Sequence, residues 1–481
     1  MKKKPNILWI CTDQQRWDTL GCYGNKFVRT PNLDKLAEQG AQFEYAYSQS
    51  PVCTPSRVSF LTGRYPRTTK CRQNGQDILK DELLVTKMLA NCGYDCGLAG
   101  KLHISACHPS VCCDVEPRID DGYTEFHWSH HAGGGWQLAN EYWAWLAEKS
   151  ESFETTPRQD SNWIYTGMPE ELHQTTWCAE KACDFIRQKA DNDKPWLFSV
   201  NMFDPHHPFN PPQSYLDRYL DVLDDIPLPA YLEGELDGKP VYQMIDHHGA
   251  YGQNHGFPFK DMPKKDHRLV RAAYWAMCDL IDKQVGRILD LLKETNQHED
   301  TIVIFTSDHG EMLGDHGIYL KGPYFYEPAI HVPLIISCPG RIKPQRSTAL
   351  VELVDLAQTL LDAANIKHAP SMQGKSLWPI LSGEAVNSHH RDDVYCEYYN
   401  AMSWHKDPPA HLTMLRTDKY KLVVNHSHSD GELYDLIADP KESHNLWNEP
   451  LATKDKTRML LQLCNRMAWT VDPLPKKRAN W

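Results

Sequence analysis

Short apolar segments alternate with amphipathic segments through most of the chain. The apolar segments have hydrophobic residues on both faces and are bounded by Gly, Pro or Asp, which is typical of strands buried in a parallel sheet. They cover residues 6–12, 96–100, 197–203, 301–307 and 332–337. Between them, apolar positions recur with the helical period at 32–39, 83–91, 175–189, 267–294 and 353–364. This alternation predicts an α/β fold with a mainly parallel sheet.

The pattern changes near residue 385. Beyond it, three short alternating segments separated by turns predict antiparallel strands at 413–416, 420–424 and 432–436, followed by a helix at 455–468. We therefore predict a large N-terminal α/β domain (1–384) and a C-terminal subdomain with a small antiparallel sheet and a closing helix (385–481). Residues 205–265 are rich in Pro, Gly, His and Asp, and are interpreted as a long surface excursion that shapes a binding site.

Length and charge narrow the classes of function. A chain of 481 residues is too long for one simple core and favours a large domain with a smaller one. The net charge of −12 argues against sequence-independent nucleic-acid binding, because phosphates would be repelled. An anionic small substrate stays compatible, since one cationic pocket can lie on an acidic surface. No segment approaches the ~20 apolar residues of a membrane span, so no membrane partner is predicted. The oligomeric state is left open.

Two further sequence features bear on the compartment. The N-terminal apolar run ends at Asp13 and no small-residue cleavage site follows, so no signal peptide is predicted. We expect a cytoplasmic protein if this N-terminus is native, and a periplasmic one if an export signal has been removed. The 15 cysteines are scattered without a disulfide framework or the CxxC spacing of a zinc site. They are interpreted as reduced, mostly buried thiols.

Polar residues follow the predicted strands at the points where they end. The strand at 6–12 leads into Asp13 and Gln14, and the strand at 301–307 leads into Asp308 and His309. Lys101 and His103 follow the strand at 96–100, and His206 follows the strand at 197–203. Ligands bind outside the carboxyl ends of parallel strands, so we expect these side chains along one edge of the sheet. Their oxygens and nitrogens suit Ca²⁺, Mg²⁺ or Mn²⁺. A polar residue ends most strands anyway, but four coincident positions favour function.

The segment SPVCTPSRVSFLTGR (50–64) places a cysteine at a predicted helix start. Pro55 fits the first helical turn and Gly63 can close the helix, so Cys53 would lie where free N–H groups favour negative charge. Arg57 can reach back to the same place. This arrangement would activate a nucleophile and hold an anion. The alternative is an inert buried thiol, which is the commoner fate of cysteine.

These residues resemble the signature of the type I sulfatases, within the alkaline-phosphatase-like superfamily. That signature is Cys-x-Pro-Ser-Arg followed by Thr-Gly, and this chain has Cys53 to Arg57 followed by Thr62-Gly63. Matching blocks extend over nearly the whole chain: PNILWICTDQQRWDTLGCYG, GKLH, DPHHPF, SDHGEMLGDHG, KGPYFYEPAIHVPLI and GELYDLIADPKESHNLW. The resemblance implies a large mixed, mainly parallel sheet sandwiched by helices, and a sulfuric ester hydrolase.

The resemblance also implies how the residues act. Cys53 would be converted by a formylglycine-generating maturase to Cα-formylglycine, whose hydrate attacks sulfur and then expels sulfate. The implied metal, usually Ca²⁺ in this family, has as its ligands Asp13, Gln14, Asp308 and His309. Arg57 and Lys101 would stabilise charge at the modified residue, and His103 would be the base for sulfate release. His206 and Lys321 would bind the sulfate and the bridging oxygen, and one of them would protonate the leaving alcohol.

Three points leave room for alternatives. Many members have a second Asp where this chain has Gln14, and some have Asn at the position of His309, so Mn²⁺ or Mg²⁺ stays open. The choice of His206 over His207 rests on the Pro-His-x-Pro register.

Three hypotheses follow for the substrate. The first is a sulfatase acting on a sulfated carbohydrate; local similarity to the iduronate-2-sulfatase group makes a uronate 2-O-sulfate from a glycosaminoglycan the leading specific choice. Candidate sugar contacts are His207, His131, Trp136 and His405, with His130, His247, His248 and Trp404 as further candidates.

The second hypothesis is another hydrolase of the same superfamily: an arylsulfatase, a phosphonate monoester hydrolase or a phosphodiesterase. Phosphonate monoester hydrolases and phosphodiesterases tend to lack the Lys and His of the GKLH block, which this chain has. The third is a non-catalytic binder of sulfated glycans, which would need a broken nucleophile or metal site, whereas both are intact.

Overall fold

The main sheet is mixed but mostly parallel. A computed structural model of the protein describes residues 3–253, 256–402, 409–428 and 430–473. Within these ranges the sheet consists of nine strands: β1 (Asn6–Thr12), β2 (Ala41–Tyr47), β3 (Asp95–Gly100), β4 (Glu125–Trp128), β7 (Trp196–Asn201), β8 (Thr301–Ser307), β9 (His331–Val332), β10 (Leu334–Ser337) and β11 (Gln345–Glu352). The strand order is β11-β2-β10-β8-β1-β7-β3-β4, and β9 pairs with β2.

Strand β1 lies at the centre and is buried on both faces. It runs parallel to β7 and β8, with Ile7 opposite Leu197 and Ile302. Its side chains alternate: Ile7 and Trp9 join one apolar cluster, whereas Leu8 and Ile10 join another on the opposite face. A strand buried on both faces is expected to be apolar throughout, which is why this segment was recognisable from sequence.

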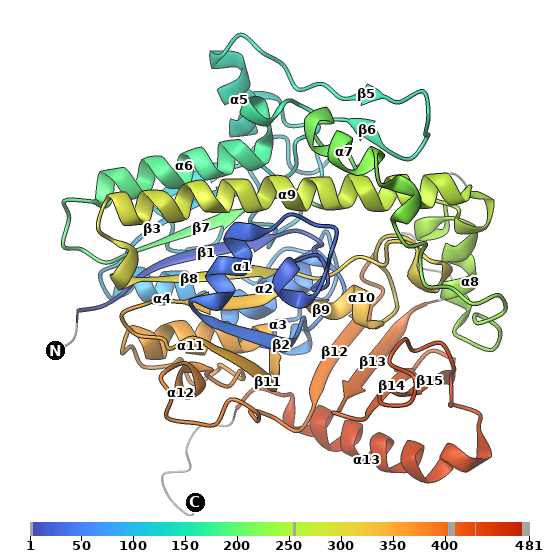
Figure 1. Ribbon diagram of the computed structural model, residues 1–481. Coiled ribbons are helices and arrows are strands. Elements are labelled where there is room, and N and C mark those ends of the chain that lie inside the picture. Colours follow the sequence, from blue (N-terminus) through green and yellow to red (C-terminus); the bar gives the residue numbers. More distant parts are fainter. Residues whose placement is uncertain (1–2, 254–255, 403–408, 429, 474–481) are drawn as a thin grey trace, which may run out of the picture.

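Helices cover both faces of the sheet (Figure 1). One layer packs against the face of Leu8 and contains α1 (Pro31–Glu38), α6 (Gln174–Lys189) and α9 (Lys264–Glu294). The other packs against the face of Ile7 and contains α2 (Cys53–Thr62), α4 (Val85–Asn91), α11 (Leu356–Ala363) and α12 (Trp378–Leu381). The predicted α/β sandwich is confirmed.

Some predicted boundaries differ from the structure. The strand expected at 332–337 is divided into β9 and β10, because Pro333 between them has no N–H to donate to the ladder. The strand expected at 197–203 ends at Asn201, and the helix expected from residue 353 begins with a 3₁₀ turn, Leu353–Asp355. Strands β2, β4 and β11 were not predicted, because polar residues interrupt their apolar pattern.

The C-terminal part forms a second sheet beside the main one (Figure 1). Its antiparallel strands are β12 (Val394–Tyr399), β13 (His411–Arg416), β14 (Tyr420–Asn425) and β15 (Asp430–Asp435), in that order. Helix α13 (Thr453–Trp469) packs on it through Met459 and Leu463. The predicted small antiparallel sheet and closing helix are confirmed, although β12 was missed. The domain boundary at residue 384 stays a prediction.

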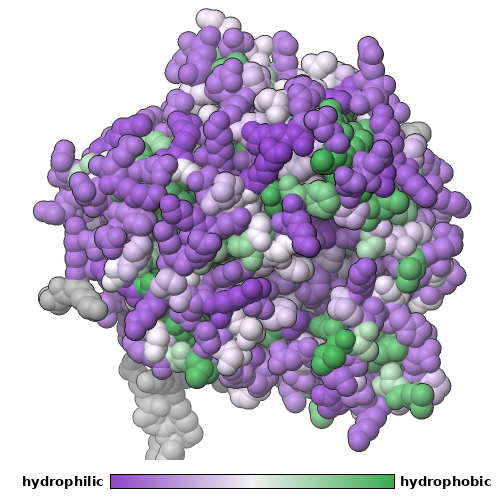
Figure 2. All heavy atoms as spheres, viewed as in Figure 1, coloured by the Kyte–Doolittle hydropathy of each residue, from purple (hydrophilic) through white to green (hydrophobic). Residues whose placement is uncertain are grey.

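The face of the molecule seen in Figure 2 is mostly hydrophilic. The face seen in Figure 2 carries charged and polar residues over most of its area, with hydrophobic residues in scattered patches. Among the described residues, no helix is both long and apolar enough to span a bilayer.

Candidate active site

The polar residues that follow the central strands meet around Cys53. Asp13 follows β1, Lys101 follows β3, and Asp308 follows β8. Lys101 forms an ion pair with Asp13, while the Arg57 guanidinium contacts Asp308 at 2.8 Å and Asp13 at 3.4 Å. The structure thus brings together, at one edge of the sheet, residues that are far apart in sequence.

Helix α2 presents Cys53 as its first residue. The preceding Val52 is extended, and the helix ends at Gly63, whose φ of 68° is left-handed and suits glycine. Every residue of α2 is buried, and the Cys53 side chain is 1% exposed. Its Sγ lies 3.0 Å from Lys321 Nζ and 3.1 Å from His309 Nε2. The helix predicted from the Pro55 and Gly63 signals is confirmed.

The electrostatics around Cys53 favour negative charge. Burial and the Asp13 carboxylate act to raise the pKa of the Cys53 thiol, but the surrounding Lys101, Lys321 and His309 lower it below its ordinary value. The pKa of Asp13 is also affected: burial acts to raise it, and the neighbouring cations hold it well below its usual range. The site therefore keeps its carboxylate ionised and can accept an anionic group.

A set of four side chains can hold a metal ion. One potential ligand atom from each of Asp13, Cys53, Asp308 and His309 lies within 4.8 Å of the others, and all four residues are buried. The backbone carbonyl of Gly310 accepts a hydrogen bond from His309 Nδ1 at 2.8 Å, so Nε2, which faces Cys53 Sγ, is the ring nitrogen that can act as a ligand. Gln14, the remaining predicted metal ligand, takes a left-handed backbone conformation (φ 65°), a strain that is common at functional sites. Carboxylate and amide oxygens with one imidazole fit a divalent cation.

Glu311 fixes the direction of the Gln14 amide, and sequence reasoning missed it. One oxygen of its buried carboxylate accepts a hydrogen bond from Gln14 Nε2, and the other accepts the backbone N–H groups of Leu313 and Leu320. Burial raises the pKa of Glu311, while these three N–H donors and the charge of Lys321 act to lower it. The carboxylate oxygen that faces Gln14 accepts the hydrogen bond, so it holds the amide nitrogen on its own side. Gln14 Oε1 then faces Lys321 Nζ at 2.7 Å. The acidic residue lies three positions after Asp308, but no sequence signal indicates its burial.

His206 and His103 flank the site on different sides. His206 Nε2 lies 2.8 Å from Lys321 Nζ, and its Nδ1 lies 2.5 Å from the His207 carbonyl oxygen. His103 Nε2 lies 3.1 Å from the hydroxyl of Thr54, the residue after Cys53. Burial and neighbouring cations lower the pKa of both His206 and His103 well below the ordinary value. Burial and the neighbouring cations therefore favour the neutral form of both imidazoles.

Comparison with known proteins identifies the family. The sulfatase family profile matches residues 5–366 of the chain. The chain belongs to the sulfatase family. A second profile, the N-sulphoglucosamine sulphohydrolase C-terminal region, matches residues 314–468 of this sulfatase. The predicted family resemblance and the assignment as a sulfuric ester hydrolase are confirmed.

Similar proteins cover nearly the whole sulfatase chain. An arylsulfatase of Clostridium perfringens (strain 13 / Type A) is 32% identical over 462 residues, which cover 92% of this chain and 90% of that protein. The iduronate 2-sulfatase of Homo sapiens is 28% identical over 535 residues, covering 93% of this chain and 92% of that protein. The structure of a phosphonate monoester hydrolase from Silicibacter pomeroyi shares the fold, with a TM-score of 0.84, 24% identity and coverage of 98% and 96% of the two chains.

The predicted sugar contacts of the sulfatase lie in different places. The His207 ring stacks on His206 at 4.1 Å between centroids, and His131 lies 5.6 Å from the ring of Phe203; both histidines are partly exposed beside the site. Trp136 is only 3% exposed and packs edge-on against His131, so it supports that ring from behind. His405 and Trp404 lie outside the described residues.

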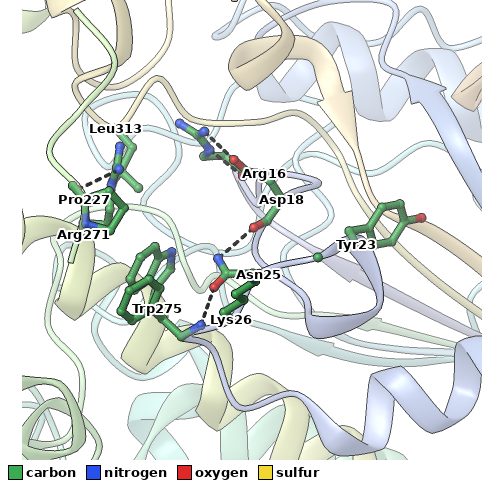
Figure 3. A pocket seen from close by; sticks show the side chains of 11 residues that line it. Arg16, Asp18, Tyr23, Asn25, Lys26, Pro227, Arg271, Trp275 and Leu313 are labelled. Carbon is green, nitrogen blue, oxygen red and sulfur yellow. Dashed lines mark hydrogen bonds and ion pairs between the residues drawn. The ribbon is translucent and has the colours of Figure 1, made fainter. Parts of the chain in front are cut away.

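Two hollows of the sulfatase are lined by residues other than those that surround Cys53. His247 and His248 line one of about 700 Å³ within the predicted 205–265 excursion. The other, of about 340 Å³, lies between the 16–27 loop and α9 (Figure 3). There Arg16 is turned toward Asp18, at 2.7 Å, and also pairs with Asp315 at 2.7 Å. These charges are satisfied by one another, and we assign no ligand to either hollow.

Proposed function

We propose that this sulfatase removes sulfate from a sulfated carbohydrate, with residue 53 acting as Cα-formylglycine after conversion by a maturase. The observation that carries the proposal is the convergence of metal-ligand side chains and two lysines on Cys53, at the start of a wholly buried helix. A thiol held so closely by ligands and cations suits a nucleophile precursor better than an inert core cysteine.

A divalent metal, Ca²⁺ in our first choice and Mn²⁺ or Mg²⁺ as alternatives, would be held by Asp13, Gln14, Asp308 and His309. When bound, it would polarise the sulfate oxygens and lower the pKa of the attacking hydroxyl. Three cationic side chains surround the two carboxylates, namely Arg57, Lys101 and Lys321. These cationic side chains favour a sulfate group beside residue 53.

The remaining residues have separate tasks in the proposed reaction. Lys101 and Arg57 stabilise charge at residue 53. Lys321 and His206, which are 2.8 Å apart, bind the sulfate and the bridging oxygen, and one of them supplies the proton for the departing alcohol. His103 lies on the other side, one residue from the nucleophile through Thr54, and takes the proton that is lost when sulfate is expelled.

The substrate class rests on the similar proteins and on the rings beside the site. Iduronate 2-sulfatase acts on a 2-sulfated uronic acid by its name, and it matches this chain over nearly its full length. We therefore propose a uronate 2-O-sulfate of a glycosaminoglycan as the first substrate to test, with His207 and His131 as its contacts.

Sulfate release from defined sulfated oligosaccharides tests the proposal. The panel should include 2-O-, 6-O- and N-sulfated disaccharides and an aryl sulfate, and mass analysis of the peptide containing residue 53 should confirm its conversion. We expect turnover of a uronate 2-sulfate that requires the converted residue. Release from the aryl sulfate alone would overturn the carbohydrate assignment.

A second candidate follows from the shared fold with a phosphonate monoester hydrolase. A phosphonate monoester or phosphodiester should then be turned over better than any sulfate ester. We favour the sulfatase activity because Lys101 and His103 both lie beside Cys53, where they suit sulfate release.

A further inference from the structure

A second group of metal-binding side chains lies beside the catalytic residues. His103 and Cys107 follow β3, and His130 follows β4. One potential ligand atom from each lies within 4.8 Å of the others. Cys107 Sγ is 3.2 Å from His130 Nδ1, and the two imidazole rings are 4.5 Å apart between centroids. The parallel pairing of β3 with β4 brings these loops together.

A buried nitrogen of this group has no partner. His103 is 7% exposed, and its Nδ1 has no hydrogen-bond partner in the described structure. The other ring nitrogen already contacts Thr54. A buried polar atom without a partner is costly, and such atoms often indicate an ion or water. Burial and nearby charges also lower the pKa of His130 well below its ordinary value, so both imidazoles offer lone pairs.

We propose that His103, Cys107 and His130 form a second metal site, selective for a borderline-soft transition ion such as Zn²⁺. One thiolate and two imidazoles are typical zinc ligands and poor calcium ligands. In tetrahedral zinc coordination the ligand atoms are about 3.5 Å apart. Cys107 Sγ and His130 Nδ1 are close to that separation, at 3.2 Å. The Cys107 thiol releases its proton to the solvent on binding. The fourth position is left for water.

Occupancy of this site would stop catalysis, an inference that rests on the proposed role of His103. Coordination through Nδ1 places the remaining ring proton on Nε2, which then has no lone pair to accept the proton lost on sulfate release. Zinc and catalysis therefore compete for one imidazole. The site would make the enzyme sensitive to zinc while calcium stays bound to Asp13 and Asp308.

Cobalt binding tests the site independently of activity. Co²⁺ is titrated into calcium-saturated protein, and the thiolate-to-cobalt charge-transfer absorption is followed. We expect one equivalent to give this absorption in the wild type, in C53S and in C112S. The absorption should be lost in C107S and in H130Q. If the charge-transfer absorption persisted in both C107S and H130Q, or were absent from C53S, the proposed metal site would be disproved.

Zinc inhibition tests the consequence. Zinc should inhibit the calcium-loaded, formylglycine-containing enzyme, and C107S should need at least about tenfold more zinc for the same inhibition. The matched variant C112S, which alters a neighbouring buried thiol, should behave as the wild type. Cobalt binding at Cys107 without zinc inhibition would disprove the competition for His103 and leave the metal site standing. Absence of any sulfatase turnover would instead contradict the proposed function.

Discussion

Two buried charge clusters in this protein differ in how completely their charges are satisfied. Near the C-terminal sheet, Lys421 Nζ lies 2.8 Å from Glu327, 2.6 Å from Glu442 and 2.9 Å from the Phe325 carbonyl oxygen. Its three donors thus have three oxygen acceptors. At the active site, Lys321 instead contacts the neutral Gln14 amide, the Cys53 thiol and the imidazoles of His206 and His309.

Burial and charge alone therefore do not distinguish a catalytic cluster from a structural one. Lys321 and Lys421 are both at most 2% exposed. The difference lies in the partners, because the Lys421 cluster is closed by two carboxylates, whereas the Lys321 cluster has cationic capacity left for an anion. We expect substitutions to affect stability in the first cluster and activity in the second.

The largest effect is expected from Cys53→Ala. Loss of the nucleophile should lower kcat by about 10⁴-fold or more, with the fold unchanged. Sulfate release measured on protein with a wild-type circular dichroism spectrum checks this, with Cys112→Ala as the control. Activity of C53A above one-hundredth of wild type would contradict the role of residue 53.

Lys421→Met should break the closed cluster. It leaves two buried carboxylates without their shared cation and should lower the free energy of unfolding by about 3–5 kcal/mol. Urea denaturation gives this value, and kcat per folded molecule should stay near wild type. Lys419→Met, on the exposed surface of the same strand region, should leave the midpoint unchanged. A stable K421M would refute the structural role.

Lys321→Met should show the opposite behaviour. We propose that Lys321 binds the bridging oxygen, so removing its charge should lower kcat by about 10²–10³-fold, while the urea midpoint stays the same or rises. Comparison of K321M with K421M under identical conditions sharpens the contrast. Equal losses of stability in the two variants would show that the clusters are alike.

The smallest effect is expected from Glu311→Gln. A neutral amide also donates hydrogen bonds, so it no longer holds Gln14, a proposed metal ligand, with its Oε1 toward Lys321. Calcium affinity, measured by calorimetry after removal of bound metal with a chelator, should fall by about 10–100-fold. Surface Glu299→Gln serves as the control, since its side chain is 73% exposed. Unchanged affinity in E311Q would remove Glu311 from the metal site.

Recognition of the strands depended on where each lies in the sheet. The central β1, β7 and β8 are buried on every residue or nearly so, and their continuous apolar runs were predicted. The strands β4 and β11 lie at the two edges of the main sheet, where one side has no neighbouring strand, and they contain Glu, Gln and Arg. Such mixed composition is compatible with a loop, which explains why they were missed.

The amino-acid sequence by itself determined the family, the helix that presents Cys53, and the residue types at four strand ends. These features are local, because strand ends, helix starts and motifs involve neighbours in the chain. Only the tertiary structure decided that Glu311 orients Gln14, that Trp136 lies behind His131, and that Cys107 meets His103 and His130. Each of these contacts depends on how loops from different strands pack together, and burial and distance between such loops are properties of the folded chain.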